Sequence, residues 1–328
     1  RSSDFTARRR IIVSDRSSVS GSQGAAHHFA LAKGTRLFEF EIGPVLGHGG
    51  FGITYRAVDT LLQEDVAIKE FLPNELAVRV SDETVKAKSA GDQDSFRTGL
   101  STFLEEARMI ARFRHPNIMQ VRRFFELHGT GYIVLEYERG RTLSQRLADG
   151  PIGEAELRDL LLRLLDGLEA VHDRGILHRD LKPSNIIIRD NGTPVLIDFG
   201  AARDFTSRHS RSITAFAAPG YSPPEQYGVG GQQGPWTDFY ALGAILYRCV
   251  TGSAPVDSLR RLRKDPLVPA TVAAAGKYDA GLLGIIDWMV EVDEANRPES
   301  AAQIRAALAA GHAPSGHAPS APSGAAAA

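Results

Sequence analysis

Residues 178–185 read HRDLKPSN, and residues 197–200 read IDFG. Between them, the apolar runs 186–188 and 195–197 are typical of two short strands. Turn formation and capping explain poorly why several ionisable and amide side chains gather at the ends of such strands. We therefore take this stretch as a candidate functional site. Its polar residues are Asp180, Lys182, Asn185 and Asp198.

A glycine-rich motif lies upstream, in VLGHGGFGITYRAV at residues 45–58. Taken alone, its G-x-G-x-x-G pattern indicates phosphate binding only weakly, and an ordinary glycine turn is the alternative. A dinucleotide-binding fold needs a helix directly after the glycines, whereas residues 53–58 alternate like a strand. A flap between antiparallel strands fits better, because backbone N–H groups approach a triphosphate where side chains are missing, and Lys69 adds a cation. The glycines are Gly47, Gly49 and Gly52.

A third motif, SPPEQY at residues 222–227, completes a set in the order and approximate spacing of the protein kinase signatures. The chain resembles the Ser/Thr protein kinases, and more specifically the eukaryotic-like kinases of bacteria, whose GGFGITY and PGYSPPEQY wording it shares. The resemblance covers roughly residues 37–310. It implies an α+β, two-lobed protein kinase fold with a β-rich N-terminal lobe and an α-helical C-terminal lobe.

The resemblance also implies a role for each polar residue of the central motif. Asp180 accepts the proton of the substrate hydroxyl, and Lys182 neutralises the moving phosphoryl group. Asn185 and Asp198 bind Mg²⁺, for which Mn²⁺ can substitute, and ATP is the phosphoryl donor. These roles agree with the chemistry, because the transition state of phosphoryl transfer carries charge on equatorial oxygens and is stabilised mainly by positioning and cations.

Lys69 needs a carboxylate partner, and the helix predicted from Phe103 to Arg114 offers two, Glu105 and Glu106. The family places this glutamate nine residues before the His of HPN, which selects Glu106. Ile110 would then pack in the core one helical turn later. Glu105 is the expected solvated neighbour, and the reverse assignment is the alternative.

The adenine site is implied between the lobes, where YIVLEYERG at residues 132–140 resembles the last strand of the small lobe and the hinge. Glu136 and Glu138 of the hinge would act through backbone groups. Thr54 replaces the usual Val, and we expect modest consequences because the two shapes are nearly the same. The residues expected to line the adenine pocket are Thr54, Ala67, the gatekeeper Leu135 and Ile187.

Composition narrows the class of protein. The 328 residues carry 38 Lys and Arg against 39 Asp and Glu, and this balance argues against a general binder of nucleic acid or anionic membranes. The single Cys249 can form neither a disulfide framework nor a Cys-based metal site, so a reducing, cytoplasmic setting is expected. No apolar run approaches the roughly 18 residues that a membrane helix needs.

The chain is expected to divide into three parts. Residues 1–34 are rich in Ser, Arg, Gly and His and predict a flexible arm. Residues 35–310 form the kinase domain, with lobes at about 35–137 and 138–310. Residues 311–328 repeat a His-Ala-Pro-Ser unit and predict a low-complexity tail, in which metal binding by the His residues is a weak alternative.

Periodicity predicts the elements of each lobe. The small lobe is expected to hold the helix from Phe103 and short strands. Leucines at i, i+3, i+4 and i+7 spacing from Leu157 to Val171 predict a long helix of the large lobe, which ends at Gly175. The predicted strands are 53–58, 65–71, 77–80, 84–88, 120–126 and 132–137.

The chain departs from the family pattern in two places. The interval from Lys69 to Glu106 is 37 residues long and contains an apparent hairpin, either a docking surface or a tolerated surface insertion. Ala218 stands where the family has a threonine beside the catalytic Asp. A pseudokinase scaffold that binds nucleotide or partners without turnover is therefore the main alternative, and its support is Ala218 alone.

We expect ATP- and Mg²⁺-dependent phosphorylation of Ser and Thr in proteins, including self-phosphorylation through transient self-association. A small-molecule kinase is disfavoured by Glu225 and Arg297, which match the family's buried ion pair, and by Asp238, which matches the Asp that orients the catalytic loop. The hydroxyls expected to be phosphorylated lie near Arg203, Arg208 and Arg211, with Arg179 as a further phosphate-binding cation. They are Thr206, Ser207, Ser210, Ser212 and Thr214, of which Ser212 and Thr214 are preferred.

Overall fold

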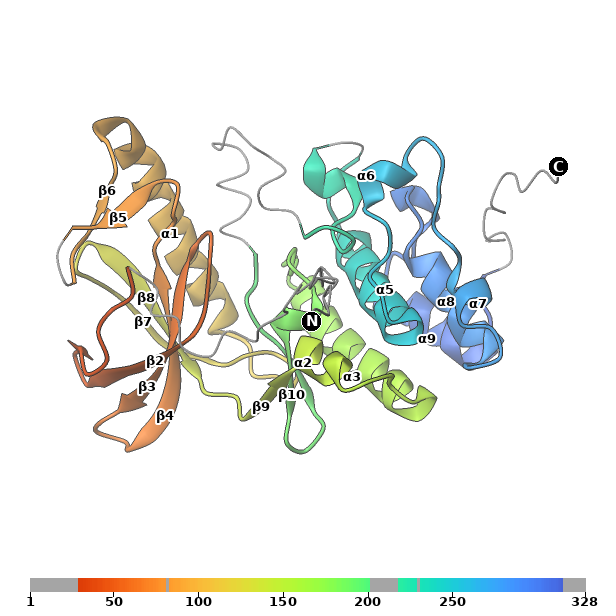
Figure 1. Ribbon diagram of the computed structural model, residues 1–328, viewed down its shortest axis with the longest axis horizontal. Helices are drawn as coiled ribbons and strands as arrows, with labels where there is room; N and C mark the ends of the chain where they lie inside the picture. Colours follow the sequence, from red (N-terminus) through yellow and green to blue (C-terminus); the bar gives the residue numbers. More distant parts are fainter. Residues whose placement is uncertain (1–28, 81–82, 201–217, 229–230, 315–328) are drawn as a thin grey trace, which may run out of the picture.

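The computed structural model describes residues 29–80, 83–200, 218–228 and 231–314. These residues form two lobes, a β-rich one and a helical one, which lie side by side in Figure 1. The α+β, two-lobed architecture expected from the sequence is confirmed. The candidate site residues come from both lobes, so the way in which the lobes meet decides the geometry of the site.

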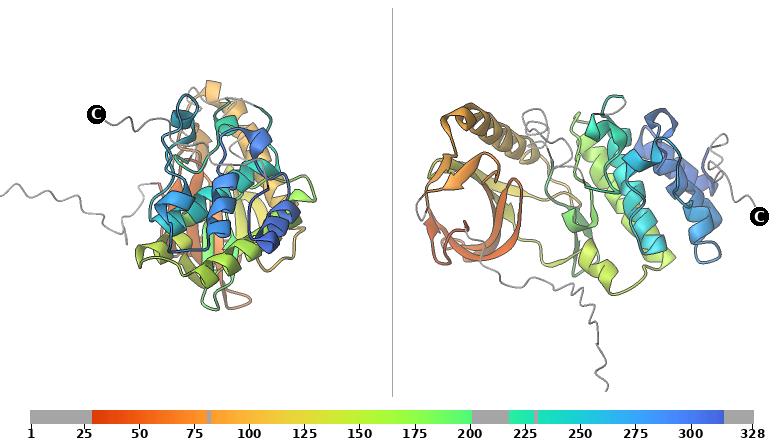
Figure 2. Two further views of the ribbon diagram at one scale, coloured as in Figure 1. Left: turned by 90° about the vertical axis from the view of Figure 1, so that its right-hand side faces the viewer. Right: turned by 45° about the horizontal axis from the view of Figure 1, so that its top comes forward.

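The small lobe is built on a six-stranded antiparallel sheet with the order β1-β2-β3-β4-β8-β7. Figure 2 shows this sheet strongly curled. A separate two-stranded sheet forms the predicted hairpin, which is confirmed. The strands are β1 (Arg36–Leu37), β2 (Phe40–Gly49), β3 (Gly52–Asp59), β4 (Glu64–Phe71), β5 (Ala77–Arg79), β6 (Val85–Ala87), β7 (Val121–Leu127) and β8 (Thr130–Glu136).

Helix α1 (Gln93–Ile110) packs against β7 and β8, and it begins ten residues before the predicted start at Phe103. Its first turns lack a clear apolar period and contain Gly and Thr, which are poor helix formers. Tertiary packing stabilises these turns instead, because Phe96 is buried and its ring stacks on Phe71 with 5.6 Å between centroids. The hairpin and the added helical turns together fill the long interval before Glu106.

Part of the predicted N-terminal arm packs on the small lobe. Leu31 is 4% exposed, and its backbone N–H donates to the Tyr55 hydroxyl at 3.0 Å. The carbonyl of Phe29 accepts a hydrogen bond from Arg79 at 2.8 Å, and the N–H of Gly34 donates to the carbonyl of Ile42 at 2.8 Å. These contacts together hold residues 29–34 on the small lobe, which their composition did not indicate. The remaining boundaries of the arm and the tail stay predictions.

The large lobe is helical, and the leucine-rich prediction is confirmed, since every leucine of that pattern is buried in α3. Helix α5 is buried on nearly all sides and forms the centre of the lobe. Figure 2 shows the long helices side by side. The helices are α2 (Leu143–Ala148), α3 (Glu154–His172), α5 (Pro235–Thr251), α6 (Ser258–Arg261), α7 (Ala270–Ala273), α8 (Ala280–Met289) and α9 (Ala301–Ala310).

A small antiparallel sheet near the junction of the lobes positions the central motif. Its strands are β9 (Gly140–Thr142), β10 (Ile186–Arg189) and β11 (Pro194–Leu196), in the order β11-β10-β9. Ile186 pairs with Leu196, so the start of β10 lies beside the end of β11. The loop 178–185 and the IDFG residues are therefore brought to the same end of this sheet.

Cys249 is buried in α5, and burial raises the pKa of its thiol to about 12, so the thiolate is suppressed. Among the residues that the structure describes, no helix combines the length and apolarity needed to span a bilayer.

Candidate active site

The loop 178–185 gathers three of the predicted site residues into one hydrogen-bonded cluster. The Oδ2 atom of Asp180 accepts hydrogen bonds from Lys182 Nζ at 3.0 Å and Asn185 Nδ2 at 2.7 Å. The Asn185 amide also donates to the backbone carbonyl of Asp180 at 2.9 Å. Asp180 is 7% exposed, so its carboxylate is held by charged and amide donors in a largely buried position.

Asp238 of α5 fixes the backbone at the start of this loop. Its carboxylate accepts the backbone N–H groups of His178 and Arg179, each at 2.8 Å, and a ring nitrogen of His172 at 2.8 Å. Burial favours a higher pKa for Asp238, but the hydrogen bond and charge of His172 outweigh it and lower the pKa. The prediction that Asp238 orients the catalytic loop is confirmed.

Gln226 is a second support that the sequence did not reveal. Its Nε2 atom donates to the carbonyl of Arg179 at 2.7 Å, in the peptide that precedes Asp180. Arg179 has a φ of 64°, in the left-handed region that side chains other than glycine rarely occupy. The loop is thus held in an uncommon conformation from two sides, by Asp238 and by Gln226. The adjacency of Gln226 to Glu225 in SPPEQY was the only available signal.

Lys69 of β4 and Asp198 form an ion pair at 3.0 Å across the two lobes. Burial alone would lower the pKa of Lys69, yet the charges of Asp198 and Glu106 raise it. For Asp198, burial favours a higher pKa, and the charge and hydrogen bond of Lys69 lower it overall. Both side chains are therefore charged at neutral pH. Like Arg179, Asp198 has a left-handed backbone, with a φ of 57°.

The two candidate glutamates of α1 differ in environment. Glu106 is 5% exposed, whereas Glu105 is exposed and accepts a hydrogen bond from Ser101 at 3.3 Å. Glu106 also lies close enough to Lys69 for its charge to raise the pKa of the lysine. This supports the choice of Glu106, and the ion pair between Glu106 and Lys69 stays a prediction.

The glycine flap between two antiparallel strands is confirmed. Strands β2 and β3 pair up to Gly49 and Gly52. The three glycines of the motif differ in what surrounds them. A Cβ atom at Gly52 would collide with the carbonyl oxygen of Glu70 on β4, so this glycine is required by the close approach of two strands. Gly47 and Gly49 have no heavy atom within 4 Å of such a position, which leaves room for a ligand.

The residues expected around adenine come from both lobes. Ala67 of β4 and Leu135 of β8 are directly paired in the sheet, and Thr54 of β3 is paired with Lys69. Ile187 lies on β10 of the large lobe and is half-buried. These positions are compatible with a pocket formed by both lobes, and its contacts with adenine stay a prediction.

The hinge residues have different side-chain roles. Glu136 ends β8 and is exposed, and its backbone N–H donates to the carbonyl of Gln120 at 2.9 Å. Glu138 receives two hydrogen bonds from the guanidinium of Arg189, at 2.6 and 2.8 Å. This bidentate pair connects the hinge to β10. The side chain of Glu138 thus has a structural function in addition to the expected backbone role.

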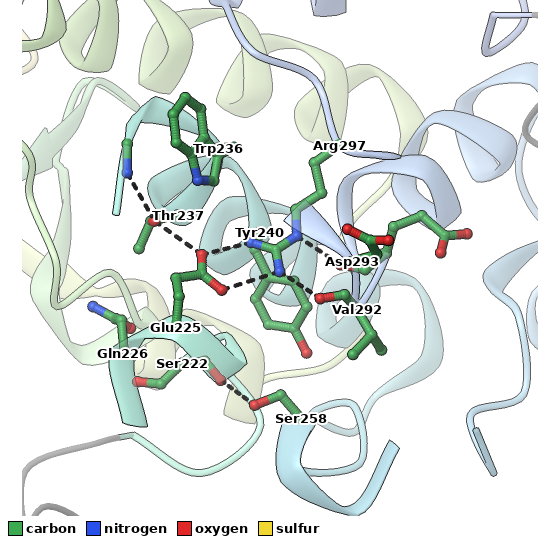
Figure 3. A network of polar contacts seen from close by, with 12 residues as sticks. Ser222, Glu225, Gln226, Trp236, Thr237, Tyr240, Ser258, Val292, Asp293 and Arg297 are labelled. Carbon is green, nitrogen blue, oxygen red and sulfur yellow. Dashed lines mark hydrogen bonds and ion pairs between the residues drawn. The ribbon is translucent and has the colours of Figure 1, made fainter. Parts of the chain in front are cut away.

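The predicted buried ion pair of the large lobe is confirmed and lies in a dense polar network (Figure 3). Glu225 and Arg297 are bonded at 2.7 and 3.2 Å, and neither side chain is exposed. The Thr237 hydroxyl donates to Glu225 at 2.9 Å, and the guanidinium of Arg297 lies 4.9 Å from the ring centre of Tyr240. The segment before α5 is therefore fixed to the C-terminal part of the lobe.

Ala218 is the first residue after the IDFG motif that the structure describes. Its N–H donates to the Ser222 hydroxyl at 3.0 Å. The five hydroxyl residues expected to be phosphorylated, from Thr206 to Thr214, lie outside the described residues, as do Arg203, Arg208 and Arg211.

Most of the chain matches a known protein family. Residues 40–307 match the family described as "Protein kinase domain". The chain belongs to this family. Serine/threonine-protein kinase pkn2 of Myxococcus xanthus is 31% identical over 287 residues, which are 83% of this chain and 32% of that protein. Serine/threonine-protein kinase PknB of Mycobacterium leprae is 31% identical over 86% of this chain and 44% of its own length.

Solved structures agree with this assignment. The apo form of PpkA-294 is 39% identical, with a TM-score of 0.79, and the match covers 85% of this kinase chain and 99% of that chain. The PknI kinase domain of M. tuberculosis, at 24% identity and a TM-score of 0.63, shows the shared fold alone. The relatives confirm the resemblance to eukaryotic-like bacterial Ser/Thr kinases. This chain spans about a third to under half the length of the two curated relatives described above.

Proposed function

We propose that this kinase chain transfers the γ-phosphoryl group of ATP to Ser and Thr hydroxyls of proteins, including its own. The observation that carries the proposal is the ion pair between Lys69 and Asp198 at 3.0 Å. Asp180 also lies close enough for its negative charge to raise the pKa of Lys69. A cation from the small lobe is thus paired with a carboxylate from the large lobe and is affected by the charge of a second one. This arrangement suits a triphosphate that bridges the lobes.

The residues of the loop 178–185 would act on the acceptor hydroxyl. Asp180 takes its proton as the oxygen attacks the γ-phosphorus, and the bond from that phosphorus to the β,γ-bridging oxygen breaks. Lys182, which donates to Asp180 at 3.0 Å, would neutralise the charge of the phosphoryl group in transit. Lys69 would hold the phosphate oxygens of ATP, and Glu106 would hold Lys69 in that position.

Asn185 and Asp198 fit a magnesium ion by the chemistry of their donor atoms. Mg²⁺ prefers hard oxygen ligands and is usually bound by one or two protein groups together with phosphates and water. Asp198 supplies a carboxylate. The amide nitrogen of Asn185 is already used as a donor toward Asp180, so its Oδ1 is the atom that can face a cation. When bound, the ion would neutralise phosphate charge and orient the phosphoryl group; Mn²⁺ fits the same donors.

The remaining assignments concern adenine. Thr54, Ala67, Leu135 and Ile187 would contact the ring, and the backbone of Glu136 and Glu138 would bind its edge. Gly47, Gly49 and Gly52 would let the backbone approach the phosphates. The open space beside Gly47 and Gly49 supports this assignment.

The test is an incubation of the purified chain with γ-labelled ATP, Mg²⁺ and a mixture of acidic and basic proteins. We expect label on the chain and on added protein, and acid hydrolysis should release phosphoserine and phosphothreonine. The absence of label in any protein would contradict the proposal. In a parallel incubation with small alcohols as acceptors, label found there and in no protein would instead favour a small-molecule kinase.

A further inference from the structure

The long interval between Lys69 and Glu106 begins beside the tip of the glycine flap. The backbone N–H of Leu72 donates to the carbonyl of Phe51 at 2.9 Å. Asn74 donates twice, from its backbone N–H to the carbonyl of Gly50 at 2.9 Å and from its side-chain amide to the carbonyl of Gly49 at 3.3 Å. Three successive carbonyls of the flap tip are thus bound by residues that directly follow β4.

The far end of the hairpin returns to the same place. Lys88 lies one residue after β6, and its Nζ atom donates to the carbonyl of Asn74 at 2.5 Å. Its backbone N–H donates to the carbonyl of Leu76 at 2.9 Å. The position of Asn74 is therefore fixed from both sides of the hairpin. We use the name flap clamp for Leu72, Asn74 and Lys88.

The hairpin itself is anchored in the interior of the small lobe. Arg79 of β5 donates to Glu70 at 2.6 Å, and Glu70 is wholly buried. The hydroxyls of Tyr55 and Tyr132 also donate to Glu70, each at 2.8 Å. Removing one partner of a buried charge is costly, so the hairpin is held firmly on the strand that carries Lys69. This anchor argues against a loosely attached surface insertion.

The clamp has a consequence for the other side of the flap. In a trans peptide the C=O and N–H groups point in opposite directions. Binding the carbonyls of Gly49 and Gly50 from the clamp side therefore directs the N–H groups of the same peptides, those of Gly50 and Phe51, away from the clamp, while Gly52 faces Gly49 in the pairing of β2 and β3. Backbone amides are the groups with which a glycine flap binds phosphates.

We propose that Asn74, supported by Lys88, is a positioning residue that holds the glycine flap ready for the phosphates of ATP. This inference rests on the proposed function, because it concerns the same nucleotide site. The flap loses less conformational freedom on binding when its backbone is already fixed, so affinity increases without a new contact to the ligand.

The test uses two variants and a matched control on the full chain. N74A removes the side-chain donor to Gly49, and K88M removes the cation that fixes Asn74 while keeping the length of the side chain. K86M is the control, because Lys86 is an exposed lysine of the same hairpin and pairs with Val78 of β5 rather than with a clamp residue. We expect N74A and K88M to raise the Kd and KM for Mg-ATP about 2- to 10-fold, the factor given by losing about one hydrogen bond, with kcat unchanged. K86M should match the wild type.

Hydrogen exchange of the amides of residues 49–52, measured without nucleotide, gives a second readout. Exchange should be faster in N74A and K88M, whereas the thermal unfolding midpoint should stay that of the K86M control. Equal ATP affinity together with equal flap exchange in all four proteins would overturn the inference. If the wild type itself bound no Mg-ATP, the proposed function would fail, and the exchange rates would still decide whether the clamp positions the flap.

Discussion

Ala218 is the residue at which the catalytic region departs from the family pattern. The resemblance implies that the hydroxyl of the family's threonine would bridge the residues at the positions of Asp180 and Lys182. Here the Nζ atom of Lys182 donates directly to the Asp180 carboxylate at 3.0 Å, and the Ser222 hydroxyl accepts a hydrogen bond from the N–H of Ala218. The loop therefore keeps its ion pair without the hydroxyl, but it loses one hydrogen bond to a charged group.

We expect Ala218→Thr to raise kcat by about 10- to 100-fold, since a hydrogen bond to a charged group contributes about 1.5 to 3 kcal/mol. The KM for ATP should change little, because the hydroxyl orients catalytic groups and does not touch the nucleotide. The measurement compares steady-state rates of both proteins after phosphatase treatment. Indistinguishable kcat values would mean that the direct contact between Lys182 and Asp180 suffices.

His178 predicts a pH dependence of stability. Burial lowers the pKa of this imidazole below its ordinary value, and nearby carboxylates oppose the shift only in part. The folded state therefore binds a proton less readily than the unfolded state, in which the pKa is about 6.5. Stability is fully present above about pH 6.5 and falls as the pH drops below it.

The check compares urea unfolding at pH 7.5 and 5.5 for the wild type and for His178→Gln, whose Nε2 amide corresponds to the ring Nε2 that contacts the carbonyl of Ile197. The variant should be less stable at pH 7.5, because it loses ring packing against Phe199. Its loss of stability between the two pH values should nevertheless be smaller than that of the wild type. An equal loss in both proteins would assign the acid sensitivity to other groups.

At the scale of elements, predictability depended on whether packing left a pattern in the sequence. Helix α3 was predicted well because its leucines repeat on one buried face. Helix α1 was predicted to begin at Phe103, since its earlier turns owe their stability to contacts such as Phe96 on Phe71. The flap clamp was missed for the same reason. Asn74 has no periodic partner, and its backbone contacts with the flap depend on the tertiary fold.

The site was predictable where its residues belong to contiguous motifs. The motifs correctly indicated the buried pair of Glu225 and Arg297 and the contacts of Asp238 with the catalytic loop. The roles of Gln226 and Glu70 were not predicted, because Gln226 binds Arg179, 47 residues away, and Glu70 binds Tyr132, 62 residues away, as well as Arg79. Gln226 lies within SPPEQY, but the motif assigns it no role, and Glu70 follows Lys69 without a motif that indicates its buried contacts.

The pair of Glu225 and Arg297 connects the segment before α5 with the turn that precedes α9. Arg297→Met should lower the free energy of unfolding by about 3 to 5 kcal/mol, because it leaves Glu225 buried without its cation. Arg305→Met is a suitable control, since Arg305 binds Asp166 and Glu169 at the surface and such pairs contribute about 1 kcal/mol or less. Urea unfolding of both variants measures the difference, and equal losses would contradict this account of the buried pair.

At the scale of the whole molecule, the active site exists only where the lobes meet. Lys69 and Glu106 belong to the small lobe, and Asp198 belongs to the large lobe. We expect Lys69→Met to reduce kcat/KM by at least about 100-fold, because it removes the cation that faces the phosphates. Glu106→Gln should cost less, since it affects Lys69 only indirectly.

Glu105→Gln is the matched control for Glu106→Gln, because Glu105 is the exposed neighbour on the same helix. Its rate should equal that of the wild type in the same phosphorylation assay. Full activity of Lys69→Met would remove this lysine from the site. A larger loss in Glu105→Gln than in Glu106→Gln would reverse the assignment of the two carboxylates.

The most direct test of the account is the rate of phosphoryl transfer by Asp180→Asn, measured in single turnover with labelled ATP, Mg²⁺ and a protein acceptor. The amide keeps the shape of the side chain and removes the proton acceptor. We predict a fall of at least about 100-fold in the rate, with the Kd for Mg-ATP within about 3-fold of the wild type. An unchanged rate in Asp180→Asn, beside an active wild type, would contradict the assignment of this carboxylate as the group that accepts the hydroxyl proton.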